Sequence, residues 1–112
     1  MSDSMQKKEG QQLQITVLGS KNTVTGFKLA GIKKTIVAEE NPQALLRQFE
    51  TLTADPSTGI LIIDNSCSPI KKEIFLFIEA NKNPIIIEIP DKTGKKSIGI
   101  TEHITKKASG SS

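Results

Sequence analysis

The sequence predicts one α/β domain, built on a parallel sheet of four strands with helices on both faces. Short β-rich segments alternate along the chain with segments of helical periodicity. The connections between the β-rich segments are too long for hairpins, which favours parallel strands joined by right-handed crossovers. With 112 residues, 36% of them hydrophobic, the chain provides for one hydrophobic core and therefore for one domain.

The first strand and the first helix are predicted near the N-terminus. The segment from Leu13 to Leu18 is rich in aliphatic and β-branched residues, and Gly19 ends the run. Asn22 or Thr23 can cap the helix that follows, and Gly31 suits the left-handed position after its last turn. The apolar positions of this helix are Val24, Phe27 and Ala30, with Leu29 as a further candidate.

A second strand at Thr35 to Ala38 and a third at Gly59 to Ile63 flank the second helix. Asn41 followed by Pro42 is typical of a helix start, with a cap and then proline in the first turn. The third strand contains no polar residue and ends at Asp64, which predicts a central strand covered on both faces. The buried stripe of the second helix is predicted to comprise Leu45, Phe49 and Leu52.

A third helix and a fourth strand complete the predicted sheet. Ser68 and Pro69 open the helix, and the strand runs from Ile85 to Ile89. A turn at Pro90 to Gly94 precedes a last, weak helix at Ser97 to Ala108. The apolar face of the third helix is predicted to comprise Ile70, Ile74, Phe77 and Ile78.

We expect the strand order 2-1-3-4, as in flavodoxin-like and receiver-like proteins. In that order a ligand site would lie where the loops Gly19 to Thr25 and Asp64 to Ser68 meet at the carboxyl edge of the sheet. The expected segments of the chain are a disordered tail at 1–12, the α/β domain at 13–96, a mobile C-terminal helix at 97–108 and a flexible tail at 109–112.

Charge and composition argue against several classes of function. The net charge is +3, but the lysines form scattered pairs and the chain has no Trp or Tyr on which bases could stack, so we expect no nucleic-acid binding. The single cysteine, Cys67, cannot form an internal disulfide. No apolar run approaches the roughly 20 residues that cross a bilayer, so we expect a cytoplasmic protein without direct membrane insertion.

The segment from Gly19 to Gly26 joins a strand to a helix and carries glycines and hydroxyl groups, as phosphate-binding loops do. It contains neither G-x-x-x-x-G-K-[ST] nor G-x-G-x-x-G, so a small nucleotide-binding enzyme is not favoured. Weak anion binding at the helix N-terminus stays open as an alternative.

Asp64, at the end of a central strand, allows another hypothesis, a receiver-like signalling domain phosphorylated on this carboxylate. Such a site needs Mg²⁺ and further carboxylates, whereas the turn from Ser20 to Asn22 that faces it contains none. Structural capping by Asp64 is therefore favoured. Cys67 and His103 have neither the spacing of metal ligands nor the surroundings of a catalytic pair.

The string from Thr23 to Ile32, TVTGFKLAGI, resembles the T-V-T-G-F-x-L-A-G-[IV] signature of the F subunit of archaeal and vacuolar-type rotary ATPases. The similarity extends from Leu13 to Ala108 and includes the strands ITVLG and GILII and the segment PIIIEIPDK. Family members often carry an acidic turn, G-D-x-D, at the position where this chain has the residues from Gly19 to Asn22. A function of the acidic turn in the family is therefore not expected of this chain.

The resemblance implies a non-catalytic central-stalk subunit without cofactor or metal. It implies binding to the coiled-coil D subunit of the rotor, within the stalk and the catalytic A/B hexamer, at the membrane periphery. It also implies a part in rotary coupling and in the regulation of ATP hydrolysis, with the C-terminal segment as the moving part. The residues expected to contact the partner are Thr23, Thr25, Phe27, Lys28, Ile98, Ile100 and Ile104.

A second set of residues is expected to have structural roles. Glycine within a helix costs about 1 kcal/mol relative to alanine, so we expect Gly26 to permit the close approach of another backbone segment. The full set comprises Gly19, Gly26, Gly31, Asp64 and Pro90.

Overall fold

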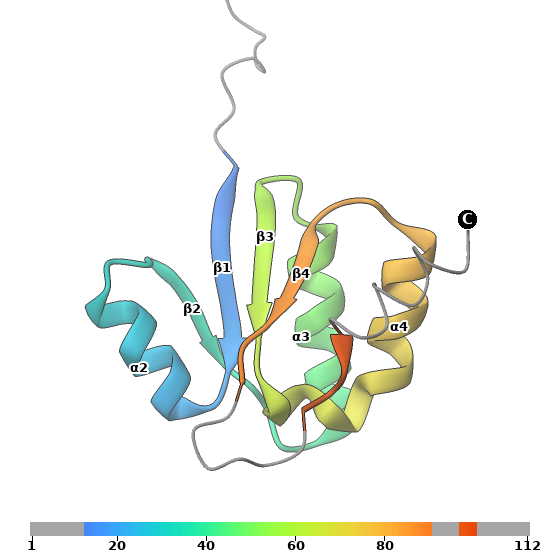
Figure 1. Cartoon of the computed structure of the whole chain (residues 1–112), viewed down its shortest axis with the longest axis horizontal. Coiled ribbons are helices and arrows are strands. Elements are labelled where there is room, and N and C mark those ends of the chain that lie inside the picture. The colour runs from blue at the N-terminus through green and yellow to red at the C-terminus, as the bar shows by residue number, and fades with distance from the viewer. Residues whose placement is uncertain (1–12, 91–96, 101–112) are drawn as a thin grey trace, which may run out of the picture.

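The four strands form one parallel sheet. The computed structural model describes residues 13–90 and 97–100. Strands β1 (Gln14–Gly19), β2 (Lys34–Val37), β3 (Thr58–Ile63) and β4 (Ile85–Glu88) lie in the order β2-β1-β3-β4 (Figure 1). Each neighbouring pair is parallel, which confirms the predicted α/β class and strand order.

Within the described residues, helices connect successive strands as the crossovers require. Helix α2 (Lys21–Leu29) follows β1 and α3 (Pro42–Ala54) follows β2, while the 3-10 helix η1 (Asn65–Ile70) leads from β3 into α4 (Lys71–Ala80). Asn41 caps α3 as predicted, because its side chain accepts hydrogen bonds from two backbone N–H groups of the first turn.

The start of α2 differs from the prediction. Ser20, rather than Asn22 or Thr23, is the N-cap, and its side chain accepts a hydrogen bond from the backbone N–H of Thr23. The helix therefore begins directly after β1, because Ser20 still has the extended backbone that an N-cap needs.

The third predicted helix also starts differently. Ser68 and Pro69 lie inside η1, and α4 begins at Lys71. The physical reason is Asp64, which accepts a hydrogen bond from the N–H of Ser66 and turns the chain into a 3-10 helix as soon as β3 ends.

The hydrophobic core lies between the sheet and helices α3 and α4. Phe49 of α3 and Phe77 of α4 meet edge to face, with ring centroids 5.4 Å apart. The predicted apolar stripes of both helices face this core, which confirms them. Its buried members are Leu18, Leu45, Phe49, Leu52, Leu61, Ile63, Cys67, Ile70, Ile74, Ile86, Ile98 and Ile100.

The opposite face of the sheet is covered by α2, which contacts β1 and β2 (Figure 1). Val17 and Val24 are buried on that side, but Ile60 and Ile62 of β3 are only half-buried. The predicted cover of β3 on both faces is therefore incomplete among the described residues, since none of their helices lies over β3 and β4 on this face.

Two glycines of the first helix region differ in their roles. Gly31 has a φ of 102°, in the left-handed region, directly after α2 as predicted. Gly26 is exposed, and a β-carbon added there would meet nothing within 4 Å. The expectation that Gly26 permits a close backbone approach is therefore wrong within the isolated chain.

The hydrophobic core extends beyond residue 96. Ile98 and Ile100 are 2% and 1% exposed and belong to the same cluster as the helical stripes. The rest of the predicted C-terminal helix, residues 101–108, and the tails at 1–12 and 109–112 lie outside the described residues.

Candidate functional site

The loops after β1 and β3 meet at the carboxyl edge of the sheet, where this topology places a ligand. Asp64 lies at their junction and is 4% exposed. Its Oδ2 accepts hydrogen bonds from the backbone N–H of Ser20 at 2.9 Å and the hydroxyl of Thr23 at 2.6 Å. Its Oδ1 accepts from the backbone N–H and the hydroxyl of Ser66. Four donors therefore surround this carboxylate and join the two loops.

The electrostatics of this junction favour an ionised Asp64. Burial alone would raise the pKa of Asp64, but the hydrogen bonds from Ser66, Thr23 and Ser20 outweigh burial and hold the pKa below its usual value. Gly19 completes the junction, since a β-carbon at that position would lie 2.8 Å from Asp64 Oδ2. The arrangement is that of a structural cap, and a carboxylate so enclosed is poorly placed to act as a phosphate acceptor.

The chemistry open to Cys67 is equally limited. The residue is fully buried, with its Sγ atom 3.7 Å from the carbonyl oxygen of Leu18. Burial, with a smaller contribution from the charge of Asp64, raises the pKa of the thiol to about 12. Cys67 is therefore a protonated core residue near neutral pH. Among residues 13–90 and 97–100, no group of three His, Cys, Asp or Glu side chains could hold a metal ion; His103 lies outside these ranges.

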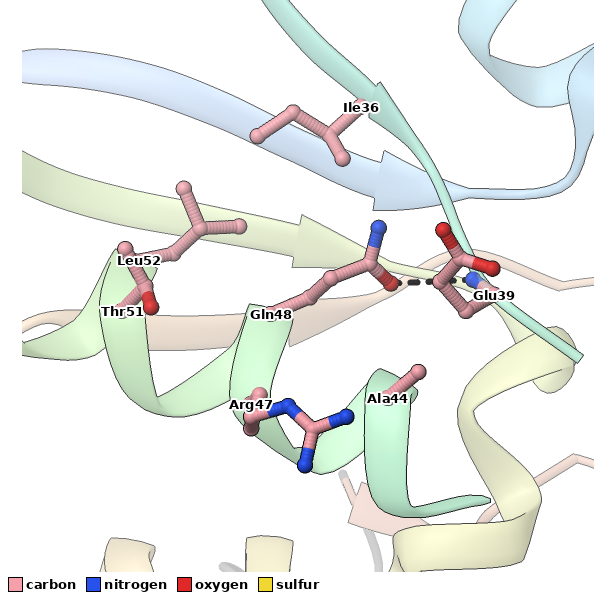
Figure 2. Close-up of a pocket in the computed structure, with 7 residues that line it drawn as sticks. All are labelled: Ile36, Glu39, Ala44, Arg47, Gln48, Thr51 and Leu52. Atoms are coloured by element: carbon pink, nitrogen blue, oxygen red, sulfur yellow. Dashed lines mark hydrogen bonds between the residues drawn. The ribbon is translucent and has the colours of Figure 1, made fainter. Parts of the chain in front are cut away.

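A groove of about 370 Å³ separates the free edge of β2 from α3 (Figure 2). Figure 2 shows the amide of Gln48 reaching from α3 to the end of β2, where its Oε1 accepts from the backbone N–H of Glu39 at 2.9 Å. Its Nε2 donates to the carbonyl oxygen of Val37 at 3.0 Å. A residue of a neighbouring parallel strand would make this same pair of bonds, so the Gln48 amide covers part of the sheet edge.

The half-covered face of the sheet presents two rows of aliphatic residues. The strand registers place Ile15, Ile60 and Ile85 in one row, and Val17, Ile62 and Ile87 in the next. In the row of Val17 the exposure rises away from α2, since Val17 is fully buried, Ile62 is half-buried and Ile87 is 42% exposed. In the other row Ile15 is 40% and Ile85 is 53% exposed. We call Ile15, Ile60, Ile62, Ile85 and Ile87 the open face. The sequence does show isoleucines on both sides of β3 and β4, but not that, among the described residues, one side lacks a cover.

The structure separates the residues that were expected to contact a partner. On α2, Thr25 and Lys28 are exposed and Phe27 is half-buried, while Thr23 is bound to Asp64. Leu29, which is not among the expected contacts, is 85% exposed at the end of the same helix.

The other expected contacts lie near the C-terminus, and two of them are buried. Ile98 and Ile100 are in the core rather than at the surface, because the carboxylate of Glu88 accepts hydrogen bonds from the backbone N–H groups of Ile98 at 2.6 Å and Gly99 at 3.1 Å. Ile104 lies outside the described residues, and Pro90 is exposed after β4.

Comparison with known proteins identifies the family. The profile of the family described as "ATP synthase (F/14-kDa) subunit" matches residues 15–108. The chain is 33% identical to the F subunit of the A-type ATP synthase of Methanocorpusculum labreanum over 97 residues, which are 79% of this chain and 96% of that protein. It is 36% identical to the corresponding F subunit of Thermococcus kodakarensis over 87 residues, with 75% and 80% of the two chains covered.

No helix within the described ranges is both long and apolar enough to cross a membrane. The carboxyl edge is closed around Asp64, and the large apolar surface lies elsewhere, on the open face. From the extent of the match and the identities, the chain belongs to the ATP synthase (F/14-kDa) subunit family, that of the F subunit of the archaeal A-type and V-type ATPases.

Proposed function

We propose that this protein is a non-catalytic central-stalk subunit that binds the coiled-coil D subunit of the rotor, called the shaft subunit below. It rotates with the shaft, at the periphery of the membrane, while ATP is made or hydrolysed on the A/B hexamer. Through its contacts it contributes to rotary coupling in proton or sodium transport and to the regulation of ATP hydrolysis. Membership of the ATP synthase (F/14-kDa) subunit family supports this role.

The observation that carries the proposal is the closed carboxyl edge of the sheet. An α/β protein of this topology that binds a nucleotide does so between the loops after β1 and β3. Here the carboxylate of Asp64 fills that position and accepts hydrogen bonds from Ser20, Thr23 and Ser66. The backbone of Gly19 packs against the same carboxylate. The position at which related folds bind a ligand is occupied here by a side chain that joins two loops. This supports a function in binding another protein.

The test is to co-express the chain with the shaft subunit of the same organism and to purify the complex by size-exclusion chromatography. We expect the two proteins to elute together, and the isolated chain to hydrolyse no ATP. Calorimetric titration of the isolated chain with Mg-ATP is the matched measurement. Micromolar binding that is lost in a Lys21→Ala variant, but kept in Lys28→Ala at the other end of α2, would contradict the proposal.

A further inference from the structure

We infer that the open face is the docking surface for one helix of the shaft subunit, which lies over β3 and β4 beside α2. This inference rests on the proposed function and adds to it the face of the domain that meets the partner. Three properties of the molecule support it: the exposed side chains of this face, the size of the area left uncovered by the described residues, and the small number of apolar residues in the segments outside them.

The open face is more apolar than a solvent-exposed sheet surface should be. In the two rows of paired residues every side chain is aliphatic and β-branched, and no polar residue interrupts them. Strands with apolar residues on both faces are typical of parallel sheets that are covered on both sides. Ile85 and Ile87 are nevertheless about half exposed, at 53% and 42%. The side chains of this face are therefore typical of a protein interior, but the described residues cover them only in part.

The missing cover has the dimensions of one helix. Strands lie about 4.8 Å apart, so the distance from β1 to β4 across β3 is roughly 10 Å, which is close to the diameter of a helix with its side chains. A strand of six residues such as β3 is about 20 Å long, which corresponds to a helix of about 13 residues. Helix α2 already covers β1 and β2, so the partner helix would lie next to it (Figure 1).

The segments of the printed sequence that lie outside the described residues contain few apolar side chains. Residues 1–12 contain only two apolar side chains, Met1 and Met5. Residues 101–112 contain only Ile104 and Ala108, and they follow Ile100, which is buried on the opposite side of the sheet. Neither segment carries a continuous apolar stripe, whereas the helices of a coiled-coil subunit do.

Charge adds a second feature of the partner. Helix α2, which borders the open face, contains Lys21 and Lys28 and no acidic residue. The partner helix should therefore carry acidic residues on the side of its apolar stripe that faces α2, in keeping with the complementary charges found across interfaces.

The experiment uses the full chain and the purified shaft subunit of the same organism. Two substitutions, Ile85→Asp and Ile87→Asp, place charges on the open face. The matched control is Leu76→Asp, because Leu76 is 62% exposed on α4 at the other side of the sheet. We expect the double Asp variant to bind at least about a hundredfold more weakly and the control to bind like the wild type. Since the Asp variant could unfold, Ile85→Ala with Ile87→Ala is the milder variant, with an expected loss of about tenfold.

Cross-linking gives an independent measurement. Cys67 is fully buried, so a cysteine introduced in place of Ile85 or Leu76 can be labelled selectively with a photoreactive group. We expect Ile85→Cys to cross-link to the shaft subunit and Leu76→Cys not to.

If the wild type binds the shaft and the open-face variants bind equally well, this inference is wrong and the proposed function stands. If the wild type does not bind the shaft at all, the proposed function fails. If cross-links join two copies of this chain instead, the face is a self-association surface and the inference is also wrong.

Discussion

Thr23 Oγ1 donates a hydrogen bond of 2.6 Å to Asp64 Oδ2, which joins the first turn of α2 to the loop after β3 across 41 positions of sequence. The same oxygen accepts from the backbone N–H of Ser20, so the start of α2 is held at two points. The link connects two elements on opposite sides of the sheet, and its loss should therefore affect the whole domain rather than one loop.

Replacing Asp64 by Ala should lower the free energy of unfolding by about 3 kcal/mol, since buried donors lose their acceptor. Thr23→Val removes one donor and should cost about 1 kcal/mol. Urea denaturation measures both. Thr25→Val, at an exposed position of the same helix, is the control. Equal midpoints for the Thr23 and Thr25 variants would show that the bond to Asp64 contributes nothing.

The contribution of Asp64 should depend on pH in a defined direction. Its pKa is lower in the folded chain than in the unfolded chain, so the stabilisation is present above the unfolded pKa of about 3.9 and is lost as the pH falls through the folded pKa. We expect the difference in stability between the wild type and Asp64→Asn to be constant from about pH 6 to pH 8 and to shrink below about pH 4. Denaturation curves at several pH values measure it, and a difference that grows towards acid pH would contradict it.

Gly26 and Gly31 should respond to alanine in opposite ways. Gly26→Ala should stabilise the isolated chain by about 1 kcal/mol, because the position is helical, exposed and without neighbours. Gly31→Ala should destabilise it by about 1 kcal/mol, because alanine is strained at a φ of 102°. Thermal unfolding of both variants decides the point. A lower melting temperature for Gly26→Ala would mean that the glycine is needed within the chain itself.

Glu88 should control how firmly residues 97–100 are held. Glu88→Gln replaces a charged acceptor of the Ile98 and Gly99 N–H groups, with an expected cost of about 1 kcal/mol. Amide exchange at these two positions should become faster. Glu50→Gln, at an exposed position of α3, is the control. Unchanged exchange in the Glu88 variant would show that the buried isoleucines alone hold the segment.

Gln48 should protect the edge of β2 from pairing with another chain. Gln48→Ala exposes the carbonyl oxygen of Val37 and the N–H of Glu39, which makes the edge available for strand addition. We expect more dimer and larger species by light scattering at raised concentration. Gln43→Ala, at an exposed position of the same helix, serves as the control. Identical masses for both variants would argue against a protective role.

The sheet could be predicted from the sequence because each strand and helix is indicated by a local pattern of residues. The apolar run of β3 and the apolar stripe of α3 follow from spacing alone, and the length of the crossovers predicts that the strands are parallel. The contacts of Gln48 and Glu88 could not be predicted, because each depends on where a distant backbone segment lies. The open face shows a different limit. Isoleucines on both sides of β3 indicate two covered faces, but a sequence pattern cannot tell whether the cover belongs to the same chain.

The enclosed position of Asp64 has a mechanical consequence. In α/β proteins that bind ligands at the carboxyl edge, the loops there must open and close, and they are a compliant part of the fold. In this chain one carboxylate connects both loops, with Gly19 packed against it. A subunit carried on a rotating shaft experiences torque. Any part of that subunit that deforms under the torque stores elastic energy instead of transmitting it. If the domain is carried on the shaft as we propose, the junction at Asp64 would stiffen it at the place where related folds yield, and the domain would turn as a rigid body.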